Sequence, residues 1–213
     1  EIESLLRLYA SGSFEDAEDL AVAITAKHTA EPVAWKVLAA IYGQTDRLTE
    51  SVEVSRKLIA LSSNDAEAHN NLGSALKKLG SFTEALESFQ MAAAIDPTFA
   101  VAHFNLGTVH MALENLELAQ ASLELAITLE PNYADGCTNY GVVLRALGRL
   151  DEAEAYHRRA LALLPDDPKA LGNLGATLHS AGKFIEAERV LLDAVSLDEE
   201  SAELQMNLGS AFL

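Results

Sequence analysis

The chain has 213 residues, of which 49% are apolar but only 6% aromatic, and its formal net charge is −17. Such an excess of negative charge repels phosphate groups and therefore argues against nucleic acid and anionic membrane surfaces as partners. The single cysteine, Cys137, excludes a disulfide within the chain and a metal cluster built on thiolates.

The first predicted elements belong to a partial, divergent repeat over residues 1–31. Leu5 stands where later units carry a glycine, and Gly12 ends the first helix. Ser13 followed by Asp16 predicts a capping box at the start of the second helix. Since the chain begins and stops inside a helical pattern, we expect it to be a piece of a longer array.

Five full repeats of 34 residues follow without a gap, and the first helix of a further repeat comes after them. The full repeats are 32–65, 66–99, 100–133, 134–167 and 168–201, and the last helix is predicted over 202–213. A fixed period of this length predicts a stack of units, each burying its apolar face against the next.

The repeat 66–99 shows the expected pattern of one unit. Apolar residues at helical spacing predict a first helix from Glu67 to Leu79, which Gly80 ends. Ser81 with Glu84 predicts a capping box for the second helix, and Pro97 stops that helix.

A recurring Asn-Leu-Gly marks the first helix of each later unit. We interpret the large second residue as a packing residue and the glycine as a site of close helix approach. The asparagines are Asn71, Asn105, Asn139, Asn173 and Asn207.

The spacing Trp/His-x2-Leu-Gly, then Ala, Phe/Leu, Ala and Pro, resembles the tetratricopeptide repeat over essentially the whole chain. Trp35, His69 and His103 occupy the first position of this motif. The resemblance implies an all-α fold: an α-solenoid, with a right-handed superhelix of stacked antiparallel helix-turn-helix repeats. It also implies that the first helices line a concave groove.

The asparagines would then form a ladder along this groove, similar to the one in the repeat region of protein O-GlcNAc transferases. An asparagine amide offers donors and an acceptor in the arrangement of a peptide group, and so it can bond the backbone of an extended peptide. With helices about 8–10 Å apart, one asparagine would meet roughly every third peptide residue. Alternatively, these asparagines tie adjacent helices together.

Other predicted groove residues are mixed in character. A clamp for a chaperone carboxylate tail is disfavoured, because Lys36 is followed one turn later by Ala40. Phe104 and Met111 are two turns apart and would form an apolar pocket. The remaining candidates for peptide contact are Lys36, Lys77, Thr108, Arg145 and His179.

The sequence shows no set of residues suited to catalysis, metal binding or a cofactor. His69 and His103 share a motif position with Trp35 and Cys137, which favours packing roles. No apolar run approaches the roughly 18 residues of a membrane span, and no secretory signal opens the chain. The composition does not fix the compartment, and we favour the cytoplasm.

Three functions stay open at this point. The leading one is a non-enzymatic module that binds an extended peptide or partner segment in the groove. The second is the substrate-recognition arm of a larger glycosyltransferase, sulfotransferase or oxygenase whose catalytic domain is absent. The third is a scaffold that self-associates through its exposed last helix, where Leu208, Ala211, Phe212 and Leu213 would be uncovered.

Overall fold

The computed structural model describes residues 1–211, which fold into thirteen α-helices with no strand among them. The chain therefore has the predicted all-α, helical-repeat architecture. Phe212 and Leu213, which we placed in the exposed last helix, lie outside the described residues. The chain divides into two compact units, Glu1–Asn105 and Leu106–Leu213, and the division falls inside α7.

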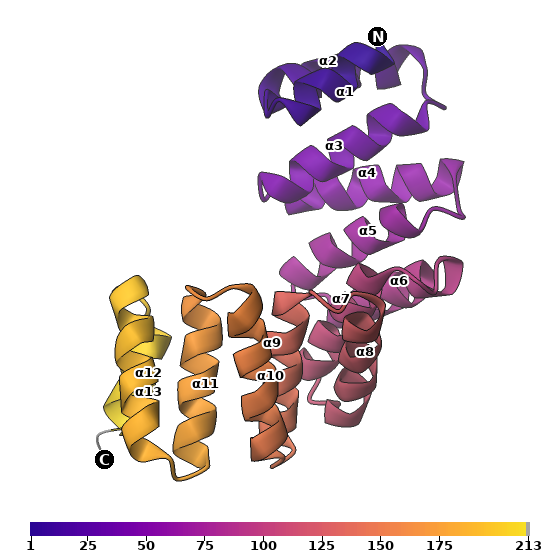
Figure 1. The fold of residues 1–213 in the computed structure, drawn as a ribbon. Coiled ribbons are helices and arrows are strands. Elements are labelled where there is room, and N and C mark those ends of the chain that lie inside the picture. The colour runs from indigo at the N-terminus through magenta and orange to yellow at the C-terminus, as the bar shows by residue number, and fades with distance from the viewer. Residues whose placement is uncertain (212–213) are drawn as a thin grey trace. The chain divides into compact units, whose positions relative to one another are not determined.

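Unit 1 consists of helical hairpins stacked one after another (Figure 1). The first helices α1, α3 and α5 lie side by side, and the second helices α2 and α4 also pack on the next first helix. The helices are α1 Ile2–Ala10, α2 Phe14–Lys27, α3 Pro32–Gln44, α4 Leu48–Leu61, α5 Ala66–Lys78 and α6 Phe82–Ile95, followed by the start of α7 Ala100–Ala112.

Unit 2 repeats the same arrangement. Here α11 lies beside both α9 and α13, and the hairpins α9–α10 and α11–α12 are closely packed (Figure 1). The helices after α7 are α8 Leu116–Leu129, α9 Ala134–Ala146, α10 Leu150–Leu163, α11 Pro168–Ser180, α12 Phe184–Leu197 and α13 Ala202–Ala211.

In the four hairpins that carry the motif, from α5–α6 to α11–α12, the glycine of Asn-Leu-Gly or Asn-Tyr-Gly permits close contact between the two helices. A Cβ added at Gly73 would lie 2.8 Å from the Phe89 ring, and one at Gly175 would lie 2.4 Å from Leu191 Cγ. Real Cβ atoms are not found at such distances, so the second helix can reach its position only because these residues lack a side chain. The predicted packing role of the glycine is confirmed at Gly73, Gly107, Gly141 and Gly175.

The helix ends match the prediction at the C-terminus but not at the predicted capping boxes. Gly80 ends the first hairpin helix of its repeat with φ of +79°, as expected for a left-handed residue. Ser81 and Ser13, however, make no side-chain capping bond. Ser81 has ψ of 63° rather than the extended conformation that turns a capping side chain back onto the helix.

Acidic residues cap some of the first helices instead. Asp65 accepts a hydrogen bond from the Ala68 backbone N–H at 3.1 Å, and Asp167 accepts one from Lys169 N–H at 3.0 Å. These carboxylates also complement the positive end of the helix dipole, so part of the chain's acidity has a structural cause.

Candidate functional site

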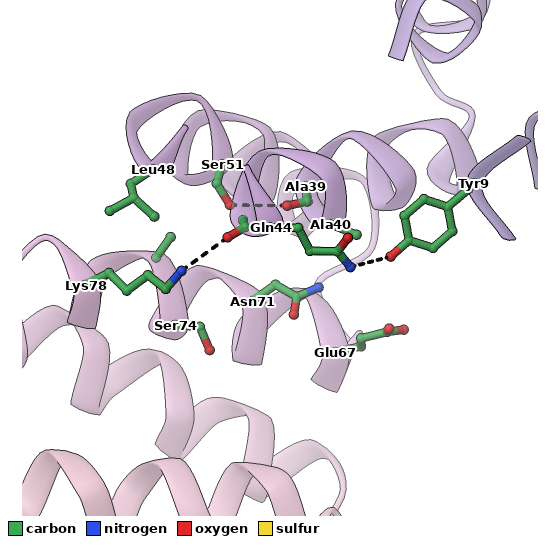
Figure 2. A pocket seen from close by; sticks show the side chains of 12 residues that line it. Tyr9, Ala39, Ala40, Gln44, Leu48, Ser51, Glu67, Asn71, Ser74 and Lys78 are labelled. Carbon is green, nitrogen blue, oxygen red and sulfur yellow. Dashed lines mark hydrogen bonds between the residues drawn. The ribbon is translucent and has the colours of Figure 1, made fainter. Parts of the chain in front are cut away.

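A pocket of about 290 Å³ opens on the face of unit 1 formed by the first helices α1, α3 and α5 (Figure 2). We call it the Asn71 pocket. Its wall residues come from these three helices and from the start of α4. They are Tyr9, Ala39, Ala40, Gly43, Gln44, Leu48, Ser51, Glu67, Asn71, Ser74, Ala75 and Lys78.

Hydrogen bonds between neighbouring repeats hold the walls of this pocket in place. Gln44 Nε2 donates to the Tyr9 hydroxyl at 3.0 Å, which joins α3 to α1. Lys78 Nζ donates to the Gly43 carbonyl at 3.3 Å and to Asp46 Oδ1 at 2.6 Å, which joins α5 to the end of α3. The pocket is therefore bordered by side chains whose polar groups are already engaged.

Two polar side chains of α5 line the pocket without such partners. The Asn71 amide and the Ser74 hydroxyl form no hydrogen bond with any other part of the chain that the structure describes. Figure 2 shows Asn71 projecting from α5 toward the space that Gln44 borders from α3. Since Asn71 and Ser74 are three residues apart, they lie on the same face of their helix. They offer donors and acceptors to a bound peptide backbone.

Of the five asparagines predicted to form a ladder along the groove, two are buried. Asn105 is only 7% exposed, and it donates to Asn70 Oδ1 at 2.9 Å while its own Oδ1 accepts from Lys77 Nζ at 3.3 Å. Asn139 is 8% exposed and accepts from Lys169 Nζ at 3.5 Å. At both positions a lysine lies over the asparagine, so the alternative role of tying helices together describes them better.

The two remaining asparagines are partly buried. Asn173 donates through Nδ2 to the Lys169 carbonyl at 3.0 Å, within its own helix. It also lines a smaller pocket of about 170 Å³ between α11 and α13, together with Glu203 and Leu204. Asn207 lies in α13. Their role in binding stays a prediction.

Two predicted groove lysines are engaged within unit 1. Lys36 pairs with Asp65 at 2.8 Å and with Glu67 at 3.5 Å, and the hydrogen bond to Asp65 raises the pKa of Lys36. Lys77 contacts Asn105, and its Nζ lies 6.0 Å from the centre of the Phe89 ring. A peptide carboxylate would have to compete with these contacts.

The other candidates are distributed along three helices. Phe104, Thr108 and Met111 follow one another along α7, and each is partly buried. His179 stacks edge-on against Phe184 with ring centres 5.2 Å apart. Arg145, in α9, has a buried Nε that bonds no atom of the described part of the chain. Peptide contact by these residues stays a prediction.

A second recess was missed by the sequence reasoning. It lies between α2 and α4, measures about 540 Å³, and is mainly apolar; we call it the Trp35 groove. Its walls are Val22, Thr25, Ala26, Thr29, Trp35, Lys57, Ala60 and Leu61. The signal was present in the repeats, because Val22 occupies a position where the next four carry Arg56, Gln90, Glu124 and Arg158.

The histidines and the cysteine behave as packing residues. His69 and His103 direct Nε2 at the carbonyls of Ser63 and Pro97, at 3.2 and 3.0 Å. Burial raises the pKa of the Cys137 thiol, which disfavours the reactive thiolate. Residues 1–211 contain no cluster of histidine, cysteine and acidic side chains arranged to hold a metal ion. None of the described helices combines the length and apolar character needed to cross a membrane.

Solved structures share this fold at low sequence identity. PilF of Pseudomonas aeruginosa is 19% identical, with a TM-score of 0.85 over 98% of this chain and 95% of that one. PilW, a type IV pilus biogenesis factor, is 20% identical, with a TM-score of 0.84 over 97% and 96%. YrrB, described as having an unusual peptide-binding site, is 21% identical, with a TM-score of 0.71 over 91% and 98%.

Family profiles match the middle and later parts of the chain. Profiles described as tetratricopeptide repeat match residues 66–99, 100–133 and 134–200. No curated protein matches the chain. Together with the stacked hairpins, the small residues at their contacts and the solved structures of like fold, these matches show that the chain is a tetratricopeptide repeat protein.

Proposed function

We propose that this protein is an interaction module that binds an extended segment of a partner protein at the Asn71 pocket. The observation that carries the proposal is the pair of Asn71 and Ser74, whose polar groups line a recess without partners in the described chain. Peptide binding in YrrB, a protein of like fold, supports the same class of function.

The size and chemistry of the pocket suit a short stretch of peptide. Its volume of about 290 Å³ is near the lower limit of ligand pockets, so it would accept one or two side chains rather than a large cofactor. Asn71 would bond the peptide backbone, while Ser74 would take a polar group beside it. Glu67 and Lys78, at the rim, would favour a partner segment that carries both charges.

Replacing Asn71 by Ala should weaken binding without unfolding the protein. Peptides selected from a random dodecamer library would serve as probes, with affinities measured by fluorescence anisotropy. We expect an affinity loss of about 3- to 10-fold for Asn71→Ala, the equivalent of one hydrogen bond, and an unchanged melting temperature.

Two control variants make this result interpretable. Asn132→Ala, in the exposed loop before α9, should change neither affinity nor stability. Asn105→Ala should lower the melting temperature, because the buried Asn70 amide loses its partner. Full affinity in Asn71→Ala would exclude the pocket as the binding site.

The role of a substrate-recognition arm in a larger enzyme stays a prediction. In such an enzyme the bound segment would belong to a substrate, whereas a free-standing module would bind a partner protein. The Asn71 pocket would bind the segment in either case.

A further inference from the structure

The repeats provide an internal comparison that identifies unusual surface residues. At the position of Leu192, the four preceding second helices carry Arg56, Gln90, Glu124 and Arg158, all exposed. Only α2 and α12 carry apolar residues there, Val22 and Leu192, which are 47% and 48% exposed.

Ile185, two turns before Leu192 in α12, is equally out of place. It is 89% exposed, whereas the matching residues of the other second helices are all polar or acidic and all exposed. These are Glu15, Thr49, Thr83, Glu117 and Asp151. Because the inner repeats expose both positions although another repeat follows them, a further repeat after α13 would not cover Ile185 or Leu192.

The Trp35 groove is the matching recess. The Trp35 indole lines it and is fixed by a hydrogen bond from Nε1 to the Thr29 carbonyl at 2.9 Å. Lys57 Nζ lies 5.1 Å from the centre of this ring, and Val22 and Leu61 supply exposed apolar walls. At the position of Val22 the next four repeats carry a longer polar side chain, which would take up part of this space.

The charges that flank the two surfaces are complementary. Glu53 and Lys57 lie four residues apart on α4, and Arg189 and Asp193 lie four residues apart on α12. None of these four side chains forms an ion pair with a described residue. When α4 of one molecule and α12 of another are aligned in parallel, Glu53 faces Arg189 and Lys57 faces Asp193, so that opposite charges meet.

We propose that the Trp35 groove binds α12 of a second copy of this chain, with Ile185 and Leu192 seated against Val22, Trp35 and Leu61. The two contacting surfaces differ, so a bound pair of copies still offers one free groove and one free α12. Such an interface propagates into chains of copies unless its rotation closes a ring. The contact uses other helix faces than the Asn71 pocket and does not depend on peptide binding there.

Complementation between two variants tests this interface. Val22→Arg closes the groove. The double variant Ile185→Asp, Leu192→Arg, which we call the stripe variant, removes the apolar surface of α12. Inner repeats already carry arginine and aspartate at the matching positions. In sedimentation velocity from about 1 µM to about 1 mM, where weak interfaces assemble, the wild type should grow beyond two copies. Each variant alone should stay a single copy, and an equimolar mixture should form a dimer and no larger species.

Trp35 reports occupancy of the groove because it is the only tryptophan of the chain. A chain that carries both Val22→Arg and Trp35→Phe has a free α12 and no tryptophan. When it is added to the stripe variant, the fluorescence of Trp35 in the stripe variant should change. Lys57→Glu should weaken association about tenfold, and Asp193→Lys in the same chain should restore it.

Two further variants serve as controls. Leu118 is 55% exposed on α8, where the other second helices carry an acidic residue, so Leu118→Glu removes an equally exposed leucine elsewhere. Leu118→Glu and Asn71→Ala should both assemble like the wild type. The proposal is overturned if the wild type stays a single copy up to about 1 mM, if the mixture forms no dimer, or if Leu118→Glu dissociates the assembly equally.

Discussion

Single residues determine how closely the two helices of a hairpin approach. Gly73, Gly107, Gly141 and Gly175 each face a large side chain of the following helix at a distance that no Cβ could tolerate. At Gly209, in the last described helix, an added Cβ has no described atom within 4 Å. The glycine of the motif is therefore required at the four earlier positions.

Gly175→Ala should destabilise the fold, since its Cβ would press on Leu191 at 2.4 Å. Overpacking of this kind costs about 1–3 kcal/mol. Gly209→Ala should be neutral or slightly stabilising, because alanine favours a helix by about 0.5–1 kcal/mol where space permits. Urea unfolding of both variants checks this; equal effects would show that backbone propensity alone determines the outcome.

His157 occupies a position that other repeats give to Phe89, Leu123 and Leu191. Its ring is fully buried, and neither nitrogen has a hydrogen-bond partner among residues 1–211. Burial, with a smaller effect of the Arg145 charge, lowers the pKa of His157 from 6.5 to about 4. The unfolded chain therefore binds a proton between these two pH values that the folded chain does not.

His157→Leu should accordingly be more stable than the wild type, most of all in mild acid. As the pH falls from 6.5 toward 4, the histidine lowers the free energy of unfolding by up to about 1.4 kcal/mol per pH unit. Above pH 6.5 it contributes no pH dependence. Urea unfolding at pH 7, 6 and 5 should give a difference between the two proteins that widens with acidity. A constant difference would mean that His157 has an ordinary pKa in the fold.

Between helices, a recurring side-chain hydrogen bond ties several inter-repeat loops to the next first helix. Trp35 Nε1 donates to the Thr29 carbonyl, and His69 and His103 bond the carbonyls six residues before them. Cys137 cannot donate in this way. There, Arg159 from α10 donates through Nη2 to the matching Pro131 carbonyl at 2.6 Å.

Arg159→Ala should therefore loosen the loop before α9, at a cost of about 0.5–1.5 kcal/mol for one lost hydrogen bond. Adding Cys137→His should recover this stability, because histidine makes the same contact at positions 69 and 103. Thermal unfolding of the single and double variants checks the prediction. If the double variant is no more stable than Arg159→Ala, the arginine acts through something other than this carbonyl.

The elements themselves were largely predictable from the sequence. Apolar residues at helical spacing and the terminal glycine placed a helix at 67–79, and α5 spans Ala66–Lys78. The capping boxes predicted at Ser13 and Ser81 do not form, because ψ at these serines is 66° and 63° rather than extended, and a residue pattern does not contain this backbone angle.

The site was predictable only in part. Asn71 does line a pocket between first helices, as its motif position indicated. Asn105 and Asn139 share that motif but are covered by Lys77 and Lys169 from neighbouring repeats. Such cover depends on pairs of residues 28 to 30 positions apart, which a pattern within one repeat does not contain.

At the scale of the whole molecule, the net charge of −17 opposes folding through self-repulsion. Exposed ion pairs such as Arg56–Glu84 act in the other direction, but each is worth at most about 1 kcal/mol. With 32 acidic residues against 15 lysines and arginines, more than half of the carboxylates have no cation available. Repulsion should dominate.

The melting temperature should therefore rise as sodium chloride increases from about 20 to about 300 mM, where screening of exposed charges sets in. Calorimetry at fixed pH 7.5 would measure it, and potassium chloride should give the same curve if the effect is one of ionic strength. A melting temperature that falls with salt would mean that attractive pairs outweigh the repulsion.

The tie between Arg159 and the Pro131 carbonyl bears on how such arrays can be recombined. Cys137, which cannot donate to the loop carbonyl, and Arg159, which donates in its place, belong to the same repeat. A gene exchange with its junction between residues 133 and 134 therefore transfers both residues together. A crossover between α9 and α10 separates them and leaves one descendant with a carbonyl that no side chain bonds. For this hydrogen bond, a whole repeat can therefore be exchanged as a unit, whereas a single helix cannot.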